Sequence, residues 1–392
     1  LLRLLFARHQ RAQKIKKAAF LLGWIVVFIV SVAVFAPKEV TQELNTVSTV
    51  EALDRVSGRG QYHTRVAGEI FKEYPLFGVG GWGYRHFCMQ YMTDEEMKEI
   101  VGLISEGNME KADAALREFA KKNRALSVID DFEDYIRKNS GDLSTENIYR
   151  FGVKEIRESD HKECVKFGLE IMELFTLKNE NVKDVIRTLG LCDEFTLFVV
   201  FIMLGWENAN EEIFNLAKKV KGWGRIHAIE KLKPETEEIK EWLLKEGIRN
   251  QVMPEYSALT CFEKSDVAKR LEGEISREEF QSIGTMLSAM LVEGPVPGIS
   301  GVKNSQDVLL QYLAHAKEQT PGLSDYETIL KICHYGKKEE VRKAALSVLK
   351  EWTEKEKKSL KEISFNLYRE LEDMVEKEVC DDVKLEMKEL LV

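Results

Sequence analysis

Hydrophobic and polar residues are distributed along the chain in two unlike patterns, which meet near residue 93. From Ala18 to Ala36 the chain has 19 residues without a charge. A helix of that length spans roughly 28 Å, which matches the hydrocarbon core of a bilayer. After Thr93, apolar residues recur at helical spacing between short polar breaks. The pattern predicts a mainly α protein, with one transmembrane helix and a short extracytoplasmic loop followed by an irregular α-solenoid.

The first predicted domain, residues 1–37, has the flanks of a membrane anchor. Pro37 follows the apolar run and ends the helix. Basic residues favour the cytoplasmic side of a membrane, so the flank before Ala18 predicts a cytoplasmic N-terminus and a single-pass protein of the cell membrane. This flank contains six basic side chains: Arg3, Arg8, Arg11, Lys14, Lys16 and Lys17. Because the chain begins with Leu1, we expect its true start to lie upstream.

The second predicted domain, residues 38–92, contains three features in order. Ser57-Gly58-Arg59 begins an amphipathic segment that runs to about Tyr74, and a Pro-Leu-Phe-Gly-Val-Gly turn follows. This order resembles the large periplasmic loop of the O-antigen ligase and polymerase family of bacterial membrane proteins. Loops of that family show a Ser-x-Arg, an amphipathic helix and a Pro-Leu-x-Gly-x-Gly turn. The resemblance covers about residues 1–92.

That resemblance implies binding of a lipid-linked glycan. Family members use loop arginines with a pyrophosphate-linked lipid donor, and guanidinium groups suit pyrophosphate. It implies this role for Arg59, Arg65 and Arg85, of which Arg59 matches the motif. His63 and His86 are candidate general bases, with a surface position as the alternative for each. The family's further transmembrane helices and its downstream histidine motif do not occur in this sequence.

The third predicted domain, residues 93–392, has the features of helical repeats. Residues 103–116 resemble half of a tetratricopeptide unit, and residues 341–349 resemble the second helix of a HEAT repeat. The pattern leaves open a further division near residue 150. Helix pairs are predicted to begin near three residues whose spacing is shorter than in the usual repeat classes: Asn181, Asn210 and Glu237.

One stretch of this domain, residues 195–204, is almost entirely apolar. It is too short to span a bilayer. We therefore predict a helix that is buried among its neighbours in the stack.

The net charge of the chain separates the same two parts. The 392 residues are 44% hydrophobic and 31% charged, with a formal net charge of −9. Residues 1–92 hold 12 Lys and Arg against 6 Asp and Glu, whereas the other 300 hold 45 against 60. An acidic body argues against a nucleic-acid partner and favours basic protein surfaces.

Motifs that would carry chemistry are missing from the body. The six cysteines lie at least 28 residues apart, so none forms a zinc or redox pair, and reduced, buried thiols would suit a cytoplasmic body. The sequence has no Walker loop, His-Glu-x-x-His or dinucleotide fingerprint. We predict neither a cofactor nor a metal ion.

Three stretches of the body resemble a group of clostridial helical proteins that carry the label limonene hydroxylase. They are residues 219–230, 256–261 and 293–300. The resemblance extends from about residue 93 to at least residue 320. It implies a hydroxylase, but such an enzyme activates oxygen through haem, flavin or iron, and the body has no sequence motif for any of these.

Aromatic and basic residues near predicted helix ends are the candidates for partner binding. Large rings there either fill gaps between helices or line a recognition groove. For the Gly222-Trp223-Gly224 segment, a turn between two helices is the alternative. The candidate residues are Trp206, Trp223, Arg225, His227 and Trp242.

These observations favour a binding function over an enzymatic one. The leading hypothesis is a helical-repeat scaffold that binds a protein or peptide, joined to a fragment of an O-antigen-ligase-like membrane protein. The alternative is a membrane ligase or polymerase that transfers a lipid-linked glycan. Because the chain changes character at Met92-Thr93, we also hypothesise that its two parts have different ancestry and were joined by fusion.

Overall fold

A computed structural model of the chain describes residues 94–294 and 296–392. The chain divides into two compact units, Leu1–Met97 and Lys98–Val392, and almost all of the described residues belong to the second. The predicted transmembrane helix, residues 18–36, and the predicted loop lie outside the described residues, so both stay predictions. The same holds for the five site residues predicted in that loop: Arg59, His63, Arg65, Arg85 and His86.

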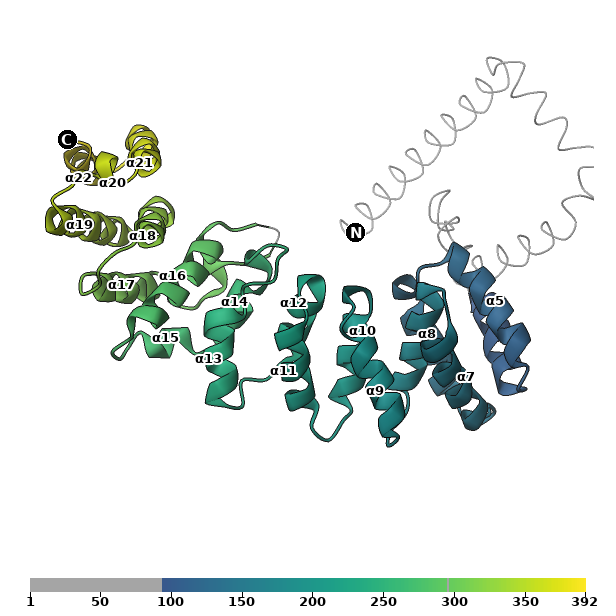
Figure 1. Ribbon diagram of the computed structural model, residues 1–392. Coiled ribbons are helices and arrows are strands. Elements are labelled where there is room, and N and C mark those ends of the chain that lie inside the picture. Colours follow the sequence, from purple (N-terminus) through teal and green to yellow (C-terminus); the bar gives the residue numbers. More distant parts are fainter. Residues whose placement is uncertain (1–93, 295) are drawn as a thin grey trace, which may run out of the picture. The chain divides into compact units, whose positions relative to one another are not determined.

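Helices are the regular secondary structure of the second unit, and no strand occurs in either described range. A mainly α fold is therefore confirmed. A first helix covers residues 94–105, and the chain continues as shown in Figure 1. The elements are α5 (Met109–Lys122), η1 (Ala125–Ser127), α6 (Ile129–Lys138), α7 (Thr145–Glu158), α8 (Lys162–Glu173), α9 (Glu180–Leu189), α10 (Asp193–Leu204), α11 (Ala209–Lys219), α12 (Gly222–Lys231), α13 (Glu237–Glu246), α14 (Glu255–Lys264), α15 (Val267–Arg270), α16 (Arg277–Leu291), η2 (Ile299–Gly301), α17 (Ser305–Ala316), α18 (Leu323–Tyr335), α19 (Glu339–Glu356), α20 (Leu360–Ile363), α21 (Phe365–Lys377) and α22 (Asp381–Leu390).

The helices from α7 to α18 pack mainly on helices near them in sequence. In what we call the even row, α8, α10, α12, α14, α16 and α18, each helix packs directly on the next. The helices of the odd row, α7, α9, α11 and α13, pack mainly against the even row. Each helix thus buries an apolar face on its neighbours, as expected of stacked helix pairs. The helices α9, α11 and α13 begin within one residue of the predicted starts at Asn181, Asn210 and Glu237.

Two segments that resemble known repeats form the expected local structure. In residues 103–116, Gly107 has a φ of +82° and turns the chain between the first helix and α5. Glycine takes this left-handed conformation at low cost. Residues 341–349 lie within α19, where Val341, Ala345 and Leu349 are fully buried. Residue 150 lies in the interior of α7, so no helix ends there.

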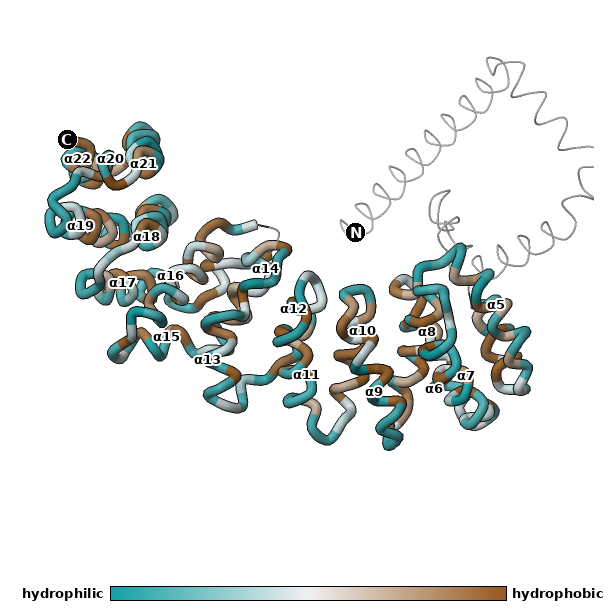
Figure 2. The backbone as a smooth tube through the Cα atoms, viewed as in Figure 1, coloured by the Kyte–Doolittle hydropathy of each residue, from teal (hydrophilic) through white to brown (hydrophobic). Residues whose placement is uncertain are grey.

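Helix α10 contains the apolar stretch 195–204 and is mostly buried, as predicted. Figure 2 shows it as a largely hydrophobic segment between neighbouring helices. Phe198, Val199 and Ile202 are buried, whereas Phe201 and Leu204 are partly open to solvent. Among the described helices, none combines the length and apolar character that a membrane crossing requires.

Two glycines allow α7 and α8 to approach each other closely. A Cβ atom added at Gly168 of α8 would lie 2.7 Å from the Glu155 Cβ of α7. One added at Gly152 of α7 would lie 2.7 Å from the Ile171 side chain of α8. Carbon atoms do not approach this closely without strain, so the two backbones can come together only because both positions lack a side chain. This contact fixes the position of α7.

Basic side chains connect neighbouring helix pairs through backbone carbonyls. The Lys264 Nζ of α14 donates hydrogen bonds to the carbonyls of Ile229, Glu230 and Leu232, at distances of 2.9, 2.6 and 2.8 Å. The Lys355 Nζ of α19 donates to the Lys317 carbonyl at 2.8 Å. The last carbonyls of a helix have no partner within that helix, and a cation there is also favoured by the helix dipole. Each tie therefore caps one helix with a residue of another.

Candidate functional site

Open pockets lie between neighbouring helices of the stack. The α7–α9 groove has a volume of about 390 Å³ and the α9–α11 groove about 320 Å³. A third, the α13–α16 groove, has a volume of about 460 Å³. All three are lined by charged, amide or hydroxyl side chains together with parts of apolar ones. They are the candidate binding sites of the described residues.

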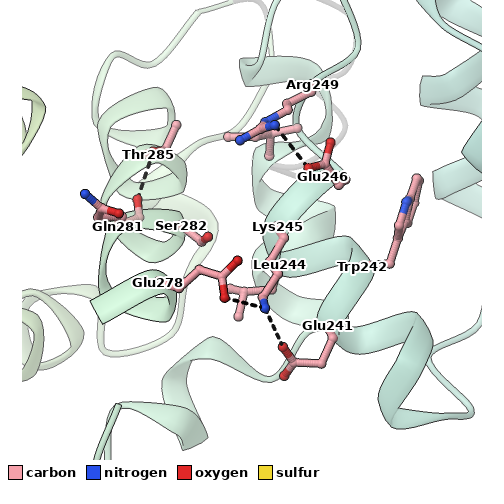
Figure 3. Close-up of a pocket in the computed structure, with 11 residues that line it drawn as sticks. Glu241, Trp242, Leu244, Lys245, Glu246, Arg249, Glu278, Gln281, Ser282 and Thr285 are labelled. Atoms are coloured by element: carbon pink, nitrogen blue, oxygen red, sulfur yellow. Dashed lines mark hydrogen bonds and ion pairs between the residues drawn. The ribbon is translucent and has the colours of Figure 1, made fainter. Parts of the chain in front are cut away.

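The α13–α16 groove is crossed by an ion pair (Figure 3). The Lys245 Nζ of α13 lies 2.8 Å from a Glu278 carboxylate oxygen of α16 and 3.7 Å from one of Glu241. Arg249 pairs with Glu246 at 3.0 Å. Both basic side chains of this lining are therefore neutralised by nearby carboxylates, so the groove offers a ligand little net attraction of either sign.

Two polar side chains on the α16 wall of this groove remain uncommitted. Within the described residues, the Gln281 amide and the Ser282 hydroxyl form no hydrogen bond, whereas the Thr285 hydroxyl donates to the Gln281 carbonyl at 2.8 Å. An amide group both donates and accepts hydrogen bonds. Gln281 and Ser282 can therefore bond the backbone of a bound peptide.

Trp242, which the sequence predicted as a partner-binding residue, also lines the α13–α16 groove. Its ring packs edge-on against Phe214 at a centroid distance of 5.6 Å. The Arg225 guanidinium lies over the same ring at 5.4 Å. These contacts hold Trp242 in place from the side of α11 and α12.

Arg225 was selected from the sequence as a partner-binding residue, but the structure places it inside the stack. Only 9% of the residue is exposed. Its Nε donates to the Val220 carbonyl and one Nη to the Arg249 carbonyl, each at 2.9 Å. Burial lowers the pKa of the guanidinium. Arg225 therefore caps the ends of α11 and α13 instead of facing a partner.

Trp206 is likewise buried, with 7% exposed. Lys183 and Arg187 of α9 both lie over its ring, each at 5.1 Å. Its indole N–H is buried and finds no acceptor among the described residues. Trp206 thus serves as a platform for two cations, which differs from the surface role expected from the sequence.

Arg187 lies directly over Trp206 and spans the α9–α11 groove. Its Nη2 and Nε atoms contact the two carboxylate oxygens of Glu212 on α11, at 2.7 and 3.1 Å. A further bond of 2.7 Å joins it to Asp184. Such a two-point contact restricts the guanidinium in position and direction. The Arg187 guanidinium of this groove is therefore already paired with carboxylates of the chain.

Of the two predicted contact residues on α12, Trp223 is exposed and His227 is half-buried. Trp223 is 43% exposed and packs on Tyr256 of α14 at 4.8 Å between ring centroids. His227 stacks on Trp223 at 6.3 Å, and partial burial lowers its pKa. Gly222 has a φ of +61°, and its N–H donates to the Asn250 carbonyl at 2.7 Å, which positions the start of α12. Sequence reasoning missed Tyr256, whose pairing with Trp223 depends on the packing of α14.

Of the three grooves, the α7–α9 groove is lined by two arginines that have no partner among the described residues. Its α7 wall carries Arg150, Lys154 and Arg157, and its α9 wall carries Asn179 and Asn181. The sequence gives only a weak signal for this site, the spacing of basic residues along one predicted helix.

Two buried carboxyl groups lie on α7 and α8, outside the lining of this groove. Glu155 of α7 is 1% exposed, and burial together with the Asp113 charge raises its pKa to about 7. Glu170 of α8 is 7% exposed, and burial together with the Glu173 charge raises its pKa to about 8. Both groups are thus more readily protonated in the folded protein than in an unfolded chain.

The thiols and acidic groups of the described ranges form no recognisable metal centre. Within residues 94–294 and 296–392, no group of three or more His, Cys, Asp or Glu is placed to hold a metal ion. Cys164, Cys261 and Cys333 are buried and unbridged, and burial raises the pKa of each thiol to about 12. Their thiolate forms are therefore scarce at neutral pH.

The fold and the grooves define the second unit as an α-helical protein of stacked helix pairs. Comparison of the chain with protein-family models, curated proteins and solved structures finds no match. The resemblances noted from the sequence therefore stay predictions.

Proposed function

We propose that residues 93–392 are a helical-repeat scaffold that binds a protein or peptide partner in the grooves between neighbouring helices. The observation that carries this proposal is the recurrence of open, polar grooves along the stack. Stacked helix pairs present such surfaces side by side, which suits a partner in extended conformation. Trp223, which is exposed, and Tyr256, which is half-buried, add an aromatic anchor of the kind that dominates protein interfaces.

The chemistry of the groove walls supports a peptide as the ligand. A peptide backbone carries one donor and one acceptor at most residues, and a bound segment must satisfy them. Gln281 and Ser282 in one groove, and Asn181 in another, have side-chain groups without a hydrogen-bond partner in the described part of the chain. These groups match the needs of an extended backbone without specifying its side chains.

Photo-crosslinking from inside a groove tests the proposal. A photoreactive amino acid replaces Ser282 in the full chain, and a matched variant carries it at Leu126, which is exposed and lies outside the three grooves. Both variants are irradiated with a library of displayed random peptides. We expect peptides to be captured from position 282 and to compete with one another for that position.

Capture at position 126 to the same extent as at position 282 would contradict the proposal, because the groove would then offer nothing beyond general exposure. The same holds if captured peptides fail to compete. Gln281→Ala supplies an independent check, since loss of its amide should reduce capture at position 282 and leave position 126 unchanged.

A second candidate function, transfer of a lipid-linked glycan, rests on the Ser57–Gly80 sequence outside the described residues. Transfer requires a sheltered site that holds donor and acceptor together. The test is glycan transfer by membranes that contain the full chain, compared with an Arg59→Ala variant. Equal transfer by the two would count against a role for Arg59.

A further inference from the structure

The α7–α9 groove has cationic walls in an acidic part of the chain. Residues 93–392 hold 45 Lys and Arg against 60 Asp and Glu. This groove nevertheless has three basic side chains, Arg150, Lys154 and Arg157, and a single carboxylate, Glu158, in its lining. Its local charge is therefore opposite to that of the surrounding domain.

Two of these basic side chains are free to bind a ligand. Arg150 and Arg157 are exposed, and neither has an ion-pair or hydrogen-bond partner among the described residues. By contrast, Arg187 in the next groove is held by Glu212 and Asp184. A guanidinium without a partner gains most from an added carboxylate or phosphate group.

The third cation is held in place by its own helix and by α5. The Lys154 Nζ lies 3.7 Å from an Asp113 oxygen and 3.9 Å from a Glu155 oxygen. Protonation of Glu155, whose pKa is raised to about 7, weakens one of these two attractions. Lys154 therefore adds positive charge to the middle of the groove without being its main ligand contact.

The spacing of the two free arginines indicates what kind of anion fits. Residues seven apart lie on the same helix face, about 10.5 Å apart along the axis. When both side chains extend straight out from the helix, one small anion cannot contact both guanidinium groups, so two anionic groups at a matching spacing fit them better. In a polyproline II segment, residues three apart share a face and are separated by about 9.3 Å.

The opposite wall supplies groups for the backbone of such a segment. Asn179 caps α9 by accepting a hydrogen bond from the Asn181 N–H at 3.0 Å. The Asn181 side-chain amide forms no hydrogen bond within the described residues and lines the groove. The positive end of the α9 dipole reinforces the preference for negative charge.

From this arrangement we infer that the α7–α9 groove binds an acidic peptide segment in polyproline II conformation, with carboxylates three residues apart on Arg150 and Arg157. The inference deepens the proposed scaffold function and rests on it. It also revises the expectation from net charge, because the partner segment at this groove is acidic, not basic.

Fluorescence anisotropy with the full chain tests this inference. The probe is a labelled peptide with the core Gly-Glu-Pro-Pro-Glu-Gly, and its control replaces both glutamates with glutamine. We expect the glutamine peptide to bind at least tenfold more weakly. The double variant Arg150→Gln with Arg157→Gln should lose about the same factor, whereas Arg369→Gln, an exposed arginine of α21 paired with Glu372, should lose nothing.

Equal binding of the acidic peptide to the double variant would overturn the inference. Competition by inorganic phosphate as strong as that by unlabelled peptide would also overturn it, because the site would then serve a small free anion. If the acidic peptide does not bind while peptides are still captured from position 282, this inference fails and the scaffold function stands. If no peptide is captured from position 282 and the acidic peptide does not bind, both fail.

Discussion

The α7–α9 and α9–α11 grooves share one helix but use their arginines in opposite ways. In the α9–α11 groove, Arg187 bonds Glu212 through two nitrogen atoms and rests on the Trp206 ring. In the α7–α9 groove, Arg150 and Arg157 have no partner within the described residues. The difference lies in the facing wall, because α11 places a carboxylate opposite Arg187, whereas α9 places the neutral amides Asn179 and Asn181 opposite α7.

The comparison teaches that similar grooves in one stack can have different roles. A paired arginine contributes to stability and positions the two helices that it joins. An unpaired one contributes little to stability and remains available for a ligand. If the domain is the proposed peptide scaffold, its recognition should depend on which neighbouring helices lack complementary charge.

The largest effect on the α7–α9 groove is expected from a substitution that shifts α7 away from α8. The change Gly168→Ala puts a Cβ atom where Glu155 already lies, so α7 must shift away from α8. We expect a loss of about 2 kcal/mol in the free energy of unfolding, as for other overpacked contacts. Acidic-peptide binding in the α7–α9 groove should weaken with it, as chemical denaturation and anisotropy can show.

Gly102→Ala is the matched control for that change. It also adds one Cβ atom inside a helix, but no other atom lies within 4 Å of it. We expect it to be neutral or to stabilise by up to about 1 kcal/mol. Equal destabilisation by the two changes would contradict the role given to the α7–α8 contact.

The pH dependence of stability should come from two buried carboxyl groups, Glu155 on α7 and Glu170 on α8. The folded-state pKa values of Glu155 and Glu170, about 7 and about 8, lie above the ordinary glutamate value of 4.5. Their contribution to stability is therefore fully present below about pH 4.5 and is lost as the pH rises through 7 and 8. We expect the free energy of unfolding to fall steadily as the pH rises from 5 to 8.

The variant Glu155→Gln with Glu170→Gln isolates this effect, because glutamine does not titrate. Its unfolding free energy, measured by denaturant titration at several pH values, should be nearly flat over the same range. A slope that persists in the variant would assign the pH dependence to other groups.

A smaller effect should follow when Arg187 in the α9–α11 groove loses its carboxylate partner. Glu212→Gln removes the carboxylate that holds Arg187 and leaves a side chain of similar shape. Because the pair is partly exposed, we expect a loss of stability of about 1 kcal/mol or less. The freed Arg187 should gain binding of acidic peptide, measured by anisotropy in the Arg150→Gln, Arg157→Gln background. If no binding is gained, an unpaired arginine in a groove is not sufficient to form a peptide-binding site.

Much of the helical architecture could be predicted from the sequence, because helix periodicity and polar breaks are local signals. The starts of α9, α11 and α13 follow from such breaks. The burial of residues 195–204 follows from their composition, yet Phe201 and Leu204 remain partly exposed.

The site could be predicted less well, because burial and pairing depend on helices that are distant in sequence. Arg225 and Trp206 have the side chains of contact residues. However, Arg225 is bonded to carbonyls at the ends of α11 and α13, and cations of α9 cover the Trp206 ring. The availability of Arg150 and Arg157 is equally invisible in sequence, because it depends on what α9 places opposite them.

The carbonyl ties made by Lys264, Lys355 and Arg225 have a mechanical consequence. Each tie connects a side chain of one helix to the end of another, and Arg225 connects the ends of α11 and α13. Under a pulling force, a helix pair cannot peel away without also uncapping its neighbour. Extension of this domain in a single-molecule force experiment should therefore proceed in steps longer than one helix pair.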